Sequence, residues 1–334
     1  MIYYSCVIII ALLIIFSTKK IENNKKYSIE QNLPIRGILA LLVVICHMFP
    51  QGYLLGNIAV SIFFCFSGYG LMYGYMNKKN PFDNYFKNKI LNTVLPFMFF
   101  NVIYYIYYYQ NGKRYTISEF IISFFNAKIL TIGWYIIVLV ILYIIFYLIF
   151  KKLRIKNNMK VYGISLSTIL LISILYMLGC QSWWYCSLLA FIIGIWLKYK
   201  EKYIIEFCER EDKYLTKIII VLFIVIYAIT RYYNLNDGTI FFVIKVYMSI
   251  SSCLIYIKYS SKYIINNKIF TFIGKYSLVI YLIHPLVIKI INSYKIQDIW
   301  KLPMVLAVSI IISCIYNNIC MYIKKLKNNG GIES

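Results

Sequence analysis

The first feature with the residue types for chemistry is the apolar stretch RGILALLVVICH, which starts at Arg36 and ends at His47. Eleven positions separate the two residues. On a helix this spacing is about 20° past three full turns, so both side chains share one face, roughly 16 Å apart along the axis. That is about half the thickness of a bilayer's hydrocarbon core. With Arg36 at one interface, His47 is expected near the midplane, where ionisable residues are candidates for function.

The second of the chain's two histidines, His284, has a similar setting. Pro50 follows His47 by three residues, and Pro285 directly follows His284. A proline inside a helix removes a backbone hydrogen bond and bends the chain. In a membrane the freed carbonyl needs protein or water as a partner, which favours a polar cavity beside each histidine. A neutral imidazole in such a cavity accepts a proton, as a general base must.

The alternative for each histidine is structural, a neutral ring hydrogen-bonded between two packed helices. The alignment of Arg36 with His47 favours the chemical interpretation for His47, whereas both interpretations stay open for His284. Tyr281 and Ser277 precede His284 by three and seven residues, so a helix places them on its face. No Cys or acidic residue stands at ligand spacing from either histidine, so no metal site is expected.

The composition is that of a protein that crosses a membrane several times. Of 334 residues, 61% are hydrophobic and 14% are charged, whereas soluble domains carry about a quarter charged residues. The mean hydropathy is +0.71. The 35 Tyr and 22 Phe suit interfacial belts and packed spans. A formal charge of +23 does not indicate nucleic-acid binding here, because the cations lie in short loops between apolar segments.

Eleven apolar windows predict an all-α polytopic membrane protein, in which an N-terminal span precedes a ten-helix core. Alternating the windows across the membrane places 25 of the 35 Lys and Arg residues on one side and 5 on the other. Positive residues accumulate in cytosolic loops, so this bias predicts a multi-pass plasma-membrane protein with the N-terminus outside and the C-terminus in the cytosol. Several windows are shorter than the roughly 20 residues of an untilted span. The windows are 2–16, 35–50, 57–76, 90–109, 129–150, 161–178, 182–197, 217–233, 239–257, 276–291 and 302–323.

The same windows divide the chain into three parts. Residues 1–32 are predicted to form the N-terminal span and a cytosolic linker, 33–323 the main membrane domain, and 324–334 a cytosolic tail. The largest predicted outer segment, 110–128, contains the amphipathic run ISEFIISFF. This run is expected to lie flat on the membrane or to dip into it.

Small residues interrupt the apolar stretch 61–75, SIFFCFSGYGLMYGY. Gly70 and Gly74 have the GxxxG spacing of closely packed membrane helices, and we favour that interpretation. Ser67 as a nucleophile is an alternative, although no base is adjacent to it in the sequence. The nine cysteines occur singly and resemble small apolar residues; Cys180 and Cys186 flank a predicted turn, where pairing is a further alternative.

Four stretches together resemble a known family. Arg36 and His47 match the Arg-x10-His signature of the membrane acyltransferases called acyltransferase 3. Three further stretches follow in the family's order, and the resemblance covers roughly residues 33–323. They are FFCFSGYG at 63–70, similar to FFxLSGF; GWYI at 133–136, similar to LWFL; and YSLVIYLIHPLV at 276–287, similar to SYxIYLxHxxV.

Two features depart from the family pattern. The extra N-terminal span precedes the usual first helix. The family's basic RxxR before a proline is represented here by Lys87 and Lys89 ahead of Pro96. These lysines share a predicted cytosolic loop with Lys78 and Lys79, where they serve as topology signals or contact a polyanionic cofactor.

The resemblance implies a membrane O-acyltransferase that moves an acyl group, usually acetyl, from cytosolic acyl-CoA to a hydroxyl of a cell-surface or exported polysaccharide. It implies acetyl-CoA as a co-substrate and no permanently bound cofactor. The expected partners are acyl-CoA, a carbohydrate acceptor and the lipid bilayer, with other polysaccharide-synthesis proteins of the cell envelope as further candidates.

The resemblance also assigns roles. His47 is implied as the catalytic residue and Arg36 as its essential companion, with His284 as a further catalytic candidate. The candidates for binding the CoA co-substrate are Arg36, Lys87 and Lys89, and those for the substrate cavity are Ser67, Tyr281 and Trp134. An alternative function is a transporter or flippase for an acylated sugar or lipid-linked glycan, because broken helices and polar residues near the midplane suit transport as well.

Overall fold

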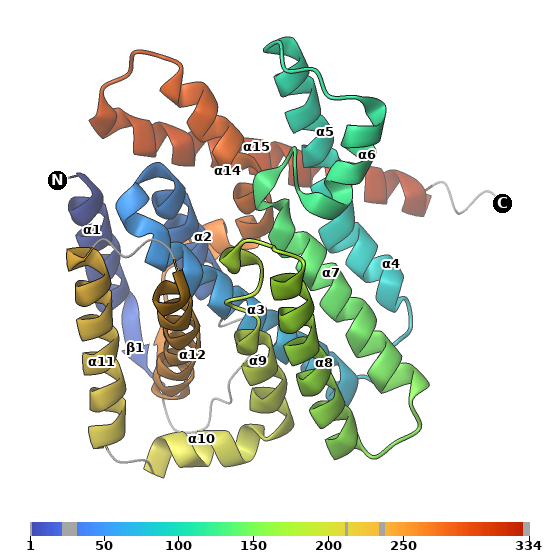
Figure 1. Ribbon diagram of the computed structural model, residues 1–334, viewed down its shortest axis with the longest axis vertical. Helices are drawn as coiled ribbons and strands as arrows, with labels where there is room; N and C mark the ends of the chain where they lie inside the picture. Colours follow the sequence, from blue (N-terminus) through green and yellow to red (C-terminus); the bar gives the residue numbers. More distant parts are fainter. Residues whose placement is uncertain (1, 22–31, 211–212, 234–237, 330–334) are drawn as a thin grey trace.

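Helices form nearly all of the regular structure in the computed structural model, which describes residues 2–21, 32–210, 213–233 and 238–329 (Figure 1). Residues 22–31 of the predicted linker and residues 330–334 of the predicted tail lie outside these described residues. The first eight helices are α1 (Ile2–Ser17), α2 (Asn32–Met48), α3 (Tyr53–Asn77), α4 (Tyr85–Lys89), α5 (Leu95–Gln110), α6 (Ile117–Asn126), α7 (Trp134–Tyr147) and α8 (Asn157–Met177). The others are α9 (Leu189–Tyr199), α10 (Glu201–Arg210), α11 (Lys213–Tyr232), α12 (Gly238–Lys262), α13 (Lys268–Lys275), α14 (Ser277–Asn292) and α15 (Asp298–Asn329).

The fold is all-α and of the membrane type, as predicted. Within the described residues, six helical segments are long and apolar enough to cross a membrane, and α13 with α14 adds a seventh if that bent pair is one span. Each predicted window contains a helix, but α1, α2, α9 and the apolar part of α11 are short, so the count of eleven spans stays a prediction. The six segments are Pro50–Asn77, Tyr85–Gln110, Thr131–Lys152, Asn157–Met177, Gly238–Lys262 and Asp298–Ile323.

A two-stranded antiparallel sheet, which the sequence analysis did not predict, joins the ends of α1 and α12. Strand β1 (Thr18–Lys20) pairs with β2 (Tyr263–Ile265), and the Asn267 side chain donates a hydrogen bond to Ser17 Oγ at 2.9 Å. The charge pattern assigns both strands to the cytosolic side. Paired strands must lie on the same side of the membrane, which agrees with the predicted alternation of spans between α1 and α12. Which side that is stays a prediction.

Two pairs of helices approach so closely that only glycine fits between them. A Cβ atom at Gly37 of α2 would lie 2.0 Å from the Phe270 carbonyl oxygen of α13, and one at Gly274 would lie 1.9 Å from the Leu33 carbonyl oxygen. These contacts are reciprocal and involve backbone, which cannot rotate away. They hold the N-terminal half of α2, which carries Arg36, directly against α13.

The second close pair is α3 with α9. A Cβ at Gly68 would lie 2.2 Å from the Phe191 carbonyl oxygen, and one at Gly194 would lie 2.0 Å from the Cys65 carbonyl oxygen. Gly70 and Gly74 have no such neighbour within 4 Å, so the predicted packing role of that pair was wrong. GxxxG spacing tells which residues share a helix face, but it does not tell which face meets another helix.

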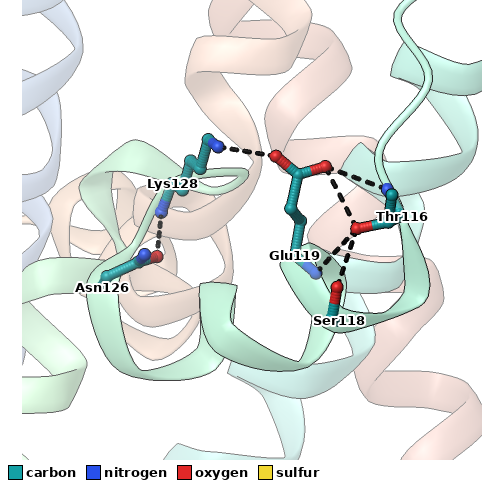
Figure 2. Close-up of polar contacts among 5 residues, drawn as sticks. All are labelled: Thr116, Ser118, Glu119, Asn126 and Lys128. Atoms are coloured by element: carbon teal, nitrogen blue, oxygen red, sulfur yellow. Dashed lines mark hydrogen bonds and ion pairs between the residues drawn. The ribbon is translucent and has the colours of Figure 1, made fainter.

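Helix α6 is the amphipathic helix expected within 110–128, and its first turn is closed by a capping box (Figure 2). The Glu119 N–H donates to Thr116 Oγ1 at 3.2 Å, and the Thr116 N–H donates to Glu119 Oε2 at 3.0 Å. Lys128 Nζ donates to the other carboxylate oxygen, Oε1, at 2.8 Å. At its middle, α6 is tied to α5 by a buried hydrogen bond from Asn101 Nδ2 to Ser123 Oγ at 2.8 Å.

The Glu119 carboxylate makes the start of α6 sensitive to acid. Its hydrogen bonds with Lys128 and then with the Thr116 backbone lower the pKa of Glu119 from its ordinary value of 4.5 to about 2. Because the folded-state pKa is lowered, the stabilisation is complete above pH 4.5 and is lost as the pH falls toward 2. We expect hydrogen–deuterium exchange, corrected for intrinsic rates, to show protection of the first turn of α6 falling across this range.

The variant Glu119→Gln should reproduce that loss of protection at pH 7, because the neutral amide has one acceptor oxygen where the carboxylate offers two charged ones to Lys128 and Thr116. Asp298→Asn is the matched control, since Asp298 forms a similar exposed pair with Lys301 at 2.7 Å on α15. Equal protection of α6 in the wild type and Glu119→Gln at neutral pH would contradict this role of the carboxylate.

Candidate active site

His47 lies in the last turn of α2, next to a sharp change in chain direction. Helix α2 ends at Met48, a 3₁₀ turn follows at Pro50–Gly52, and α3 begins at Tyr53. A bend beside His47 was expected from the sequence. Instead, α2 ends just before the proline, so no continuous helix passes through it. The His47 side chain is exposed to a cavity at this turn, and its depth in a bilayer stays a prediction.

His284 lies in the middle of α14 and is fully buried. Helices α13 and α14 meet at an angle of 79°, so Lys275 ends α13 and does not stand at the foot of the helix that carries His284. The chain turns at Tyr276, between the two helices, and α13 lies directly against α2.

The two histidines, far apart in the sequence, contact each other. His284 Nε2 and His47 Nδ1 are 3.2 Å apart, and the ring centroids are 4.9 Å apart. His284 Nδ1 lies 3.0 Å from the Ile280 carbonyl oxygen, and His47 Nδ1 lies 2.9 Å from the Val43 carbonyl oxygen. A carbonyl oxygen only accepts hydrogen bonds, so each Nδ1 carries a hydrogen.

This assignment determines which ring nitrogens of the two histidines carry a hydrogen and which offer a lone pair. The neutral His284 ring presents the lone pair of Nε2 to the Nδ1–H of His47, and that one hydrogen is shared between this lone pair and the Val43 carbonyl oxygen. The remaining nitrogen of His47, Nε2, is then the lone pair available to a substrate hydroxyl. A protonated His284 would place two N–H groups against each other, so the geometry keeps His284 neutral while His47 Nδ1 carries its hydrogen.

Helix α14 is held in this position by a tyrosine of α5. The Tyr104 hydroxyl accepts a hydrogen bond from the Leu286 N–H at 2.9 Å and donates one to the Leu282 carbonyl at 3.3 Å. It therefore bridges a backbone donor and acceptor on both sides of Pro285. The Tyr104 hydroxyl therefore gives hydrogen-bond partners to backbone groups next to Pro285, where the helix lacks one of its own bonds. In apolar surroundings such backbone groups need a partner within the protein.

The cavity beside His47, which we call the His47 cavity, has a volume of about 580 Å³, within the ~300–1,000 Å³ of small-ligand sites. Of the residues predicted for a substrate cavity, Tyr281 and Trp134 line it, and Ser67 does not. The Tyr281 hydroxyl donates to the Ile132 carbonyl at 2.7 Å, which fixes its ring on the wall. Most other lining residues are apolar or aromatic, and the main polar ones are Asn57, Thr131, Ser187 and Lys245.

Asn57 and the segment before α9 form a polar wall that was not predicted from the sequence. Ser187 Oγ and Cys186 Sγ each donate to Asn57 Oδ1 at 3.1 Å, and Ser61 Oγ donates to Ser187 Oγ at 3.0 Å. Cys180 and Cys186 are free thiols, so the alternative of a disulfide was wrong. The available signal was a run of polar residues, Asn57 and Ser61, one helical turn apart in an apolar stretch.

Arg36 and Ser67 lie in a second polar group, beside Tyr135, and neither residue lines the His47 cavity. Ser67 lies beside the hydroxyls of Tyr135 and Tyr143, and the Arg36 guanidinium is an electrostatic neighbour of both. The Arg36 Cζ is also 5.8 Å from the centroid of the Phe66 ring. Arg36 thus shares α2 with His47 as predicted, but it does not line the same cavity.

The two predicted CoA-binding lysines have different surroundings. Lys89 lies with its Nζ 4.2 Å from the Tyr143 ring centroid and lines a small pocket of about 110 Å³ together with Lys78 and Asn88. Lys87 is exposed and is not part of the pocket wall. Gly70 and Gly74 also line this pocket, so they lie at a pocket wall and not at the helix–helix contact that was predicted for them.

Aromatic rings connect the two polar regions. The Tyr135 ring lies 5.4 Å from the Tyr281 ring, and the Tyr281 ring lies 6.1 Å from His284, measured between centroids. From Lys89, contacts therefore lead through Tyr143 and the Ser67–Arg36 group to Tyr135 and then to the histidine pair. In the part of the chain that the structure describes, no group of three or more His, Cys, Asp or Glu is placed to hold a metal ion.

These features define an all-α membrane protein with a cavity-facing histidine that is backed by a second, buried histidine. Residues 35–318 match the family model Acyl_transf_3, an acyltransferase domain. This match spans most of the chain, which therefore belongs to the acyltransferase 3 family of membrane acyltransferases. Comparisons with curated proteins and with solved structures gave no match.

Proposed function

We propose that the protein is an O-acyltransferase that moves an acyl group, most simply acetyl, from cytosolic acyl-CoA to a hydroxyl of a cell-surface or exported glycan. The observation that carries the proposal is the hydrogen-bonded pair of His47 and His284 at the cavity. Membership of the acyltransferase family supplies the reaction class. The 25-to-5 distribution of Lys and Arg supports a cytosolic donor side and an outer acceptor side.

His47 acts as the general base in the proposed reaction. Its Nε2 takes the proton of the acceptor hydroxyl as the oxygen attacks the thioester carbonyl carbon. The tetrahedral intermediate collapses, the C–S bond breaks, and the CoA sulfur takes the proton from the His47 imidazolium. The products are a glycan ester and free CoA, so atoms and charges balance in one direct transfer.

His284 serves as a positioning residue in this scheme, because it reaches the reacting atoms only through His47. Its Nε2 accepts from His47 Nδ1, which keeps Nε2 of His47 unprotonated and directed away from His284. When His47 takes a proton, the same hydrogen bond becomes charge-assisted and strengthens. The carboxylate of a hydrolase triad orients its histidine in the same way, but here the accepting group is the neutral His284 ring.

The donor is proposed to enter from the pocket that contains Lys78 and Lys89. Ammonium groups bind phosphates as point charges, and Arg36 offers a bidentate fork deeper in the bundle. The thioester end would then pass Ser67 and Tyr135 to reach His47. This route keeps the predicted CoA-binding roles of Arg36 and Lys89 and gives Ser67, which was predicted for the substrate cavity, a place beside Tyr135 on the donor path.

The first experiment separates catalysis from transport. Purified protein in lipid nanodiscs is incubated with radiolabelled acetyl-CoA and cell-envelope glycan from the producing cells. A transferase yields labelled glycan esters and free CoA in equal amounts. A transporter or flippase, the alternative weighed from the sequence, yields no ester, and that result would overturn the proposed function.

Replacing Lys89 by alanine should raise the KM for acyl-CoA about tenfold or more, because a hydrogen bond to a charged group contributes about 1.5–3 kcal/mol. The matched control is Lys87→Ala, which removes an exposed lysine two positions away that does not line the pocket. Initial rates over a range of acyl-CoA concentrations measure the effect. Equal KM values for both variants would contradict a donor site at this pocket.

A further inference from the structure

Trp183 is an exposed tryptophan at the edge of the His47 cavity. It lines that cavity, yet 47% of its surface is exposed. It belongs to a 3₁₀ turn, Ser182–Trp184, between α8 and α9. The neighbouring Trp184 packs on Trp134 with ring centroids 6.2 Å apart, whereas no ring in the described part of the chain packs on Trp183. The face of its indole is therefore available to a ligand that enters the cavity.

Hydrogen bonds fix this turn on both sides of the indole. Before it, Ser182 Oγ accepts a hydrogen bond from Lys245 Nζ of α12 at 2.8 Å. After it, Ser187 Oγ and Cys186 Sγ each donate to Asn57 Oδ1 of α3 at 3.1 Å. The turn is thus tied to two helices, and the indole between these contacts has a defined place. A group that is ordered before binding lowers the entropy cost of holding a ligand.

The cavity lies near the helix ends that the charge pattern assigns to the outer side of the membrane. Four separate stretches of the chain contribute to its wall, and each lies in or beside a predicted outer segment. They are represented by Tyr53, Thr131, Trp183 and Phe241. Among the Trp, Tyr and Phe side chains of the wall, Trp183 is the most exposed. A glycan that reaches His47 from the outer side would therefore extend past Trp183.

Tryptophan is also common at membrane interfaces, where its indole anchors the end of a helix. Trp300, in the first turn of α15, suits that role, because it is 60% exposed and does not line the cavity. Trp183 instead shares the cavity wall with His47. This position favours a contact with the ligand of the cavity over a contact with lipid.

The size and chemistry of the cavity suit more than one sugar. Its volume of about 580 Å³ is that of a site for a drug-sized ligand, which is larger than a single sugar ring. An aromatic plane packs on the apolar C–H face of a sugar, whereas the hydroxyls need polar partners. The wall offers both, with the indole of Trp183 at its edge and the polar groups of Asn57 and Ser187 beside it.

We propose that Trp183 forms a second sugar subsite at the edge of the His47 cavity. Its indole stacks on the sugar next to the one whose hydroxyl meets His47, so the acceptor is an assembled glycan chain and not a single sugar. This inference rests on the acyltransferase function proposed above and adds the size class of the acceptor. It also places the acylation in a reaction sequence, because the glycosyl transfer that joins the sugars must come first.

The test uses the full-length protein in nanodiscs, labelled acetyl-CoA and cell-envelope glycan from the producing cells. The glycan is supplied uncut, and also after partial hydrolysis and separation into an oligosaccharide fraction and a single-sugar fraction. We expect the wild type to have a kcat/KM about tenfold higher for oligosaccharides than for single sugars, near the upper end of what an aromatic contact adds. Equal values overturn the chain acceptor and leave the acyltransferase function intact, whereas no ester even on the uncut glycan overturns the function itself.

The variants assign this preference to one side chain. Trp183→Leu keeps apolar bulk but removes the aromatic plane, so the ratio of the two kcat/KM values should fall from about ten to about one, through a higher KM for oligosaccharides. Trp183→Phe keeps an aromatic plane and should retain most of the preference. Trp300→Leu is the matched control, because it removes an exposed indole outside the cavity and should keep the wild-type ratio.

Two results would overturn the role of Trp183 even with a chain acceptor. If Trp183→Leu keeps the wild-type ratio, the indole does not hold the neighbouring sugar. If Trp183→Leu and Trp300→Leu lower the unfolding temperature equally and slow transfer to both fractions by the same factor, Trp183 is a membrane anchor and not a sugar subsite.

Discussion

Replacing His47 by glutamine should lower turnover at saturating acyl-CoA by about 10²–10⁴-fold, the usual contribution of a general base. Glutamine keeps much of the size and some of the hydrogen bonding of the ring, but it cannot take the proton of the acceptor hydroxyl. Binding of acyl-CoA, measured by calorimetric titration, should stay close to that of the wild type, because a base acts mainly in the transition state. Transfer at the wild-type rate by His47→Gln would reduce the residue to a packing or positioning group.

The partner histidine supplies the control for this experiment. His284→Gln retains a side-chain oxygen that can accept from His47 Nδ1, whereas His284→Leu fills similar space and accepts nothing. We therefore expect His284→Gln to keep a turnover at least tenfold above that of His284→Leu, with equal KM values for acyl-CoA. If both variants lose activity equally, and in proportion to a lower thermal unfolding temperature, His284 contributes packing only.

Adding one methyl group at Gly194 should destabilise the folded protein by about 3 kcal/mol, the upper end for overpacked cores. The new Cβ of Gly194→Ala would lie 2.0 Å from the Cys65 carbonyl oxygen and 2.8 Å from the Tyr69 nitrogen. Both atoms belong to the backbone of α3, so the helices must separate. Alanine gains about 1 kcal/mol over glycine in helix propensity, which does not offset the clash.

Gly163→Ala on α8 is the matched control, since its Cβ would meet only the flexible Ile149 side chain, at 3.6 Å. There the helix-propensity gain dominates, and we expect an unchanged or slightly raised unfolding temperature. Unfolding is followed by size-exclusion chromatography after heating in detergent. A Gly194→Ala protein as stable as Gly163→Ala would show that α3 and α9 can move apart at little cost.

Separation of α9 from α3 should also reach the His47 cavity. The segment before α9 places Ser187 and Cys186 against Asn57 of α3, and these residues form part of the cavity wall. Folded Gly194→Ala protein is therefore expected to have a higher KM for the glycan than the wild type. Its KM for acyl-CoA should change less, because neither α9 nor the segment before it contributes a residue to the lysine pocket.

The sequence by itself determined the class of protein, its family and the relation of Arg36 to His47. Composition and hydropathy set the membrane-type, all-α fold, because only helices and closed barrels satisfy every backbone group in lipid. The Arg36–His47 relation was accessible because both residues belong to one helix, whose geometry follows from the backbone alone. The amphipathic helix at 117–126 was accessible for the same reason.

Only the tertiary structure decided which distant residues meet. The contact between His47 and His284 depends on how α2 packs on α13 and α14, and the close approach at Gly37 and Gly274 controls that packing. Sequence spacing selected Gly70 and Gly74 as packing residues, but the neighbouring helix lies against the face of Gly68. The orientation of a helix about its own axis depends on all of its neighbours, so local spacing cannot supply it.

The same reason explains the lysines. Lys87 and Lys89 are equivalent in the sequence, yet only Lys89 faces Tyr143 and the pocket. Lys245 lies within the predicted span 239–257, and its place on the wall of the His47 cavity required the packing of α12 on α3. A charge in an apolar run indicates that a cavity or partner exists, but the folded arrangement alone decides which ligand it meets.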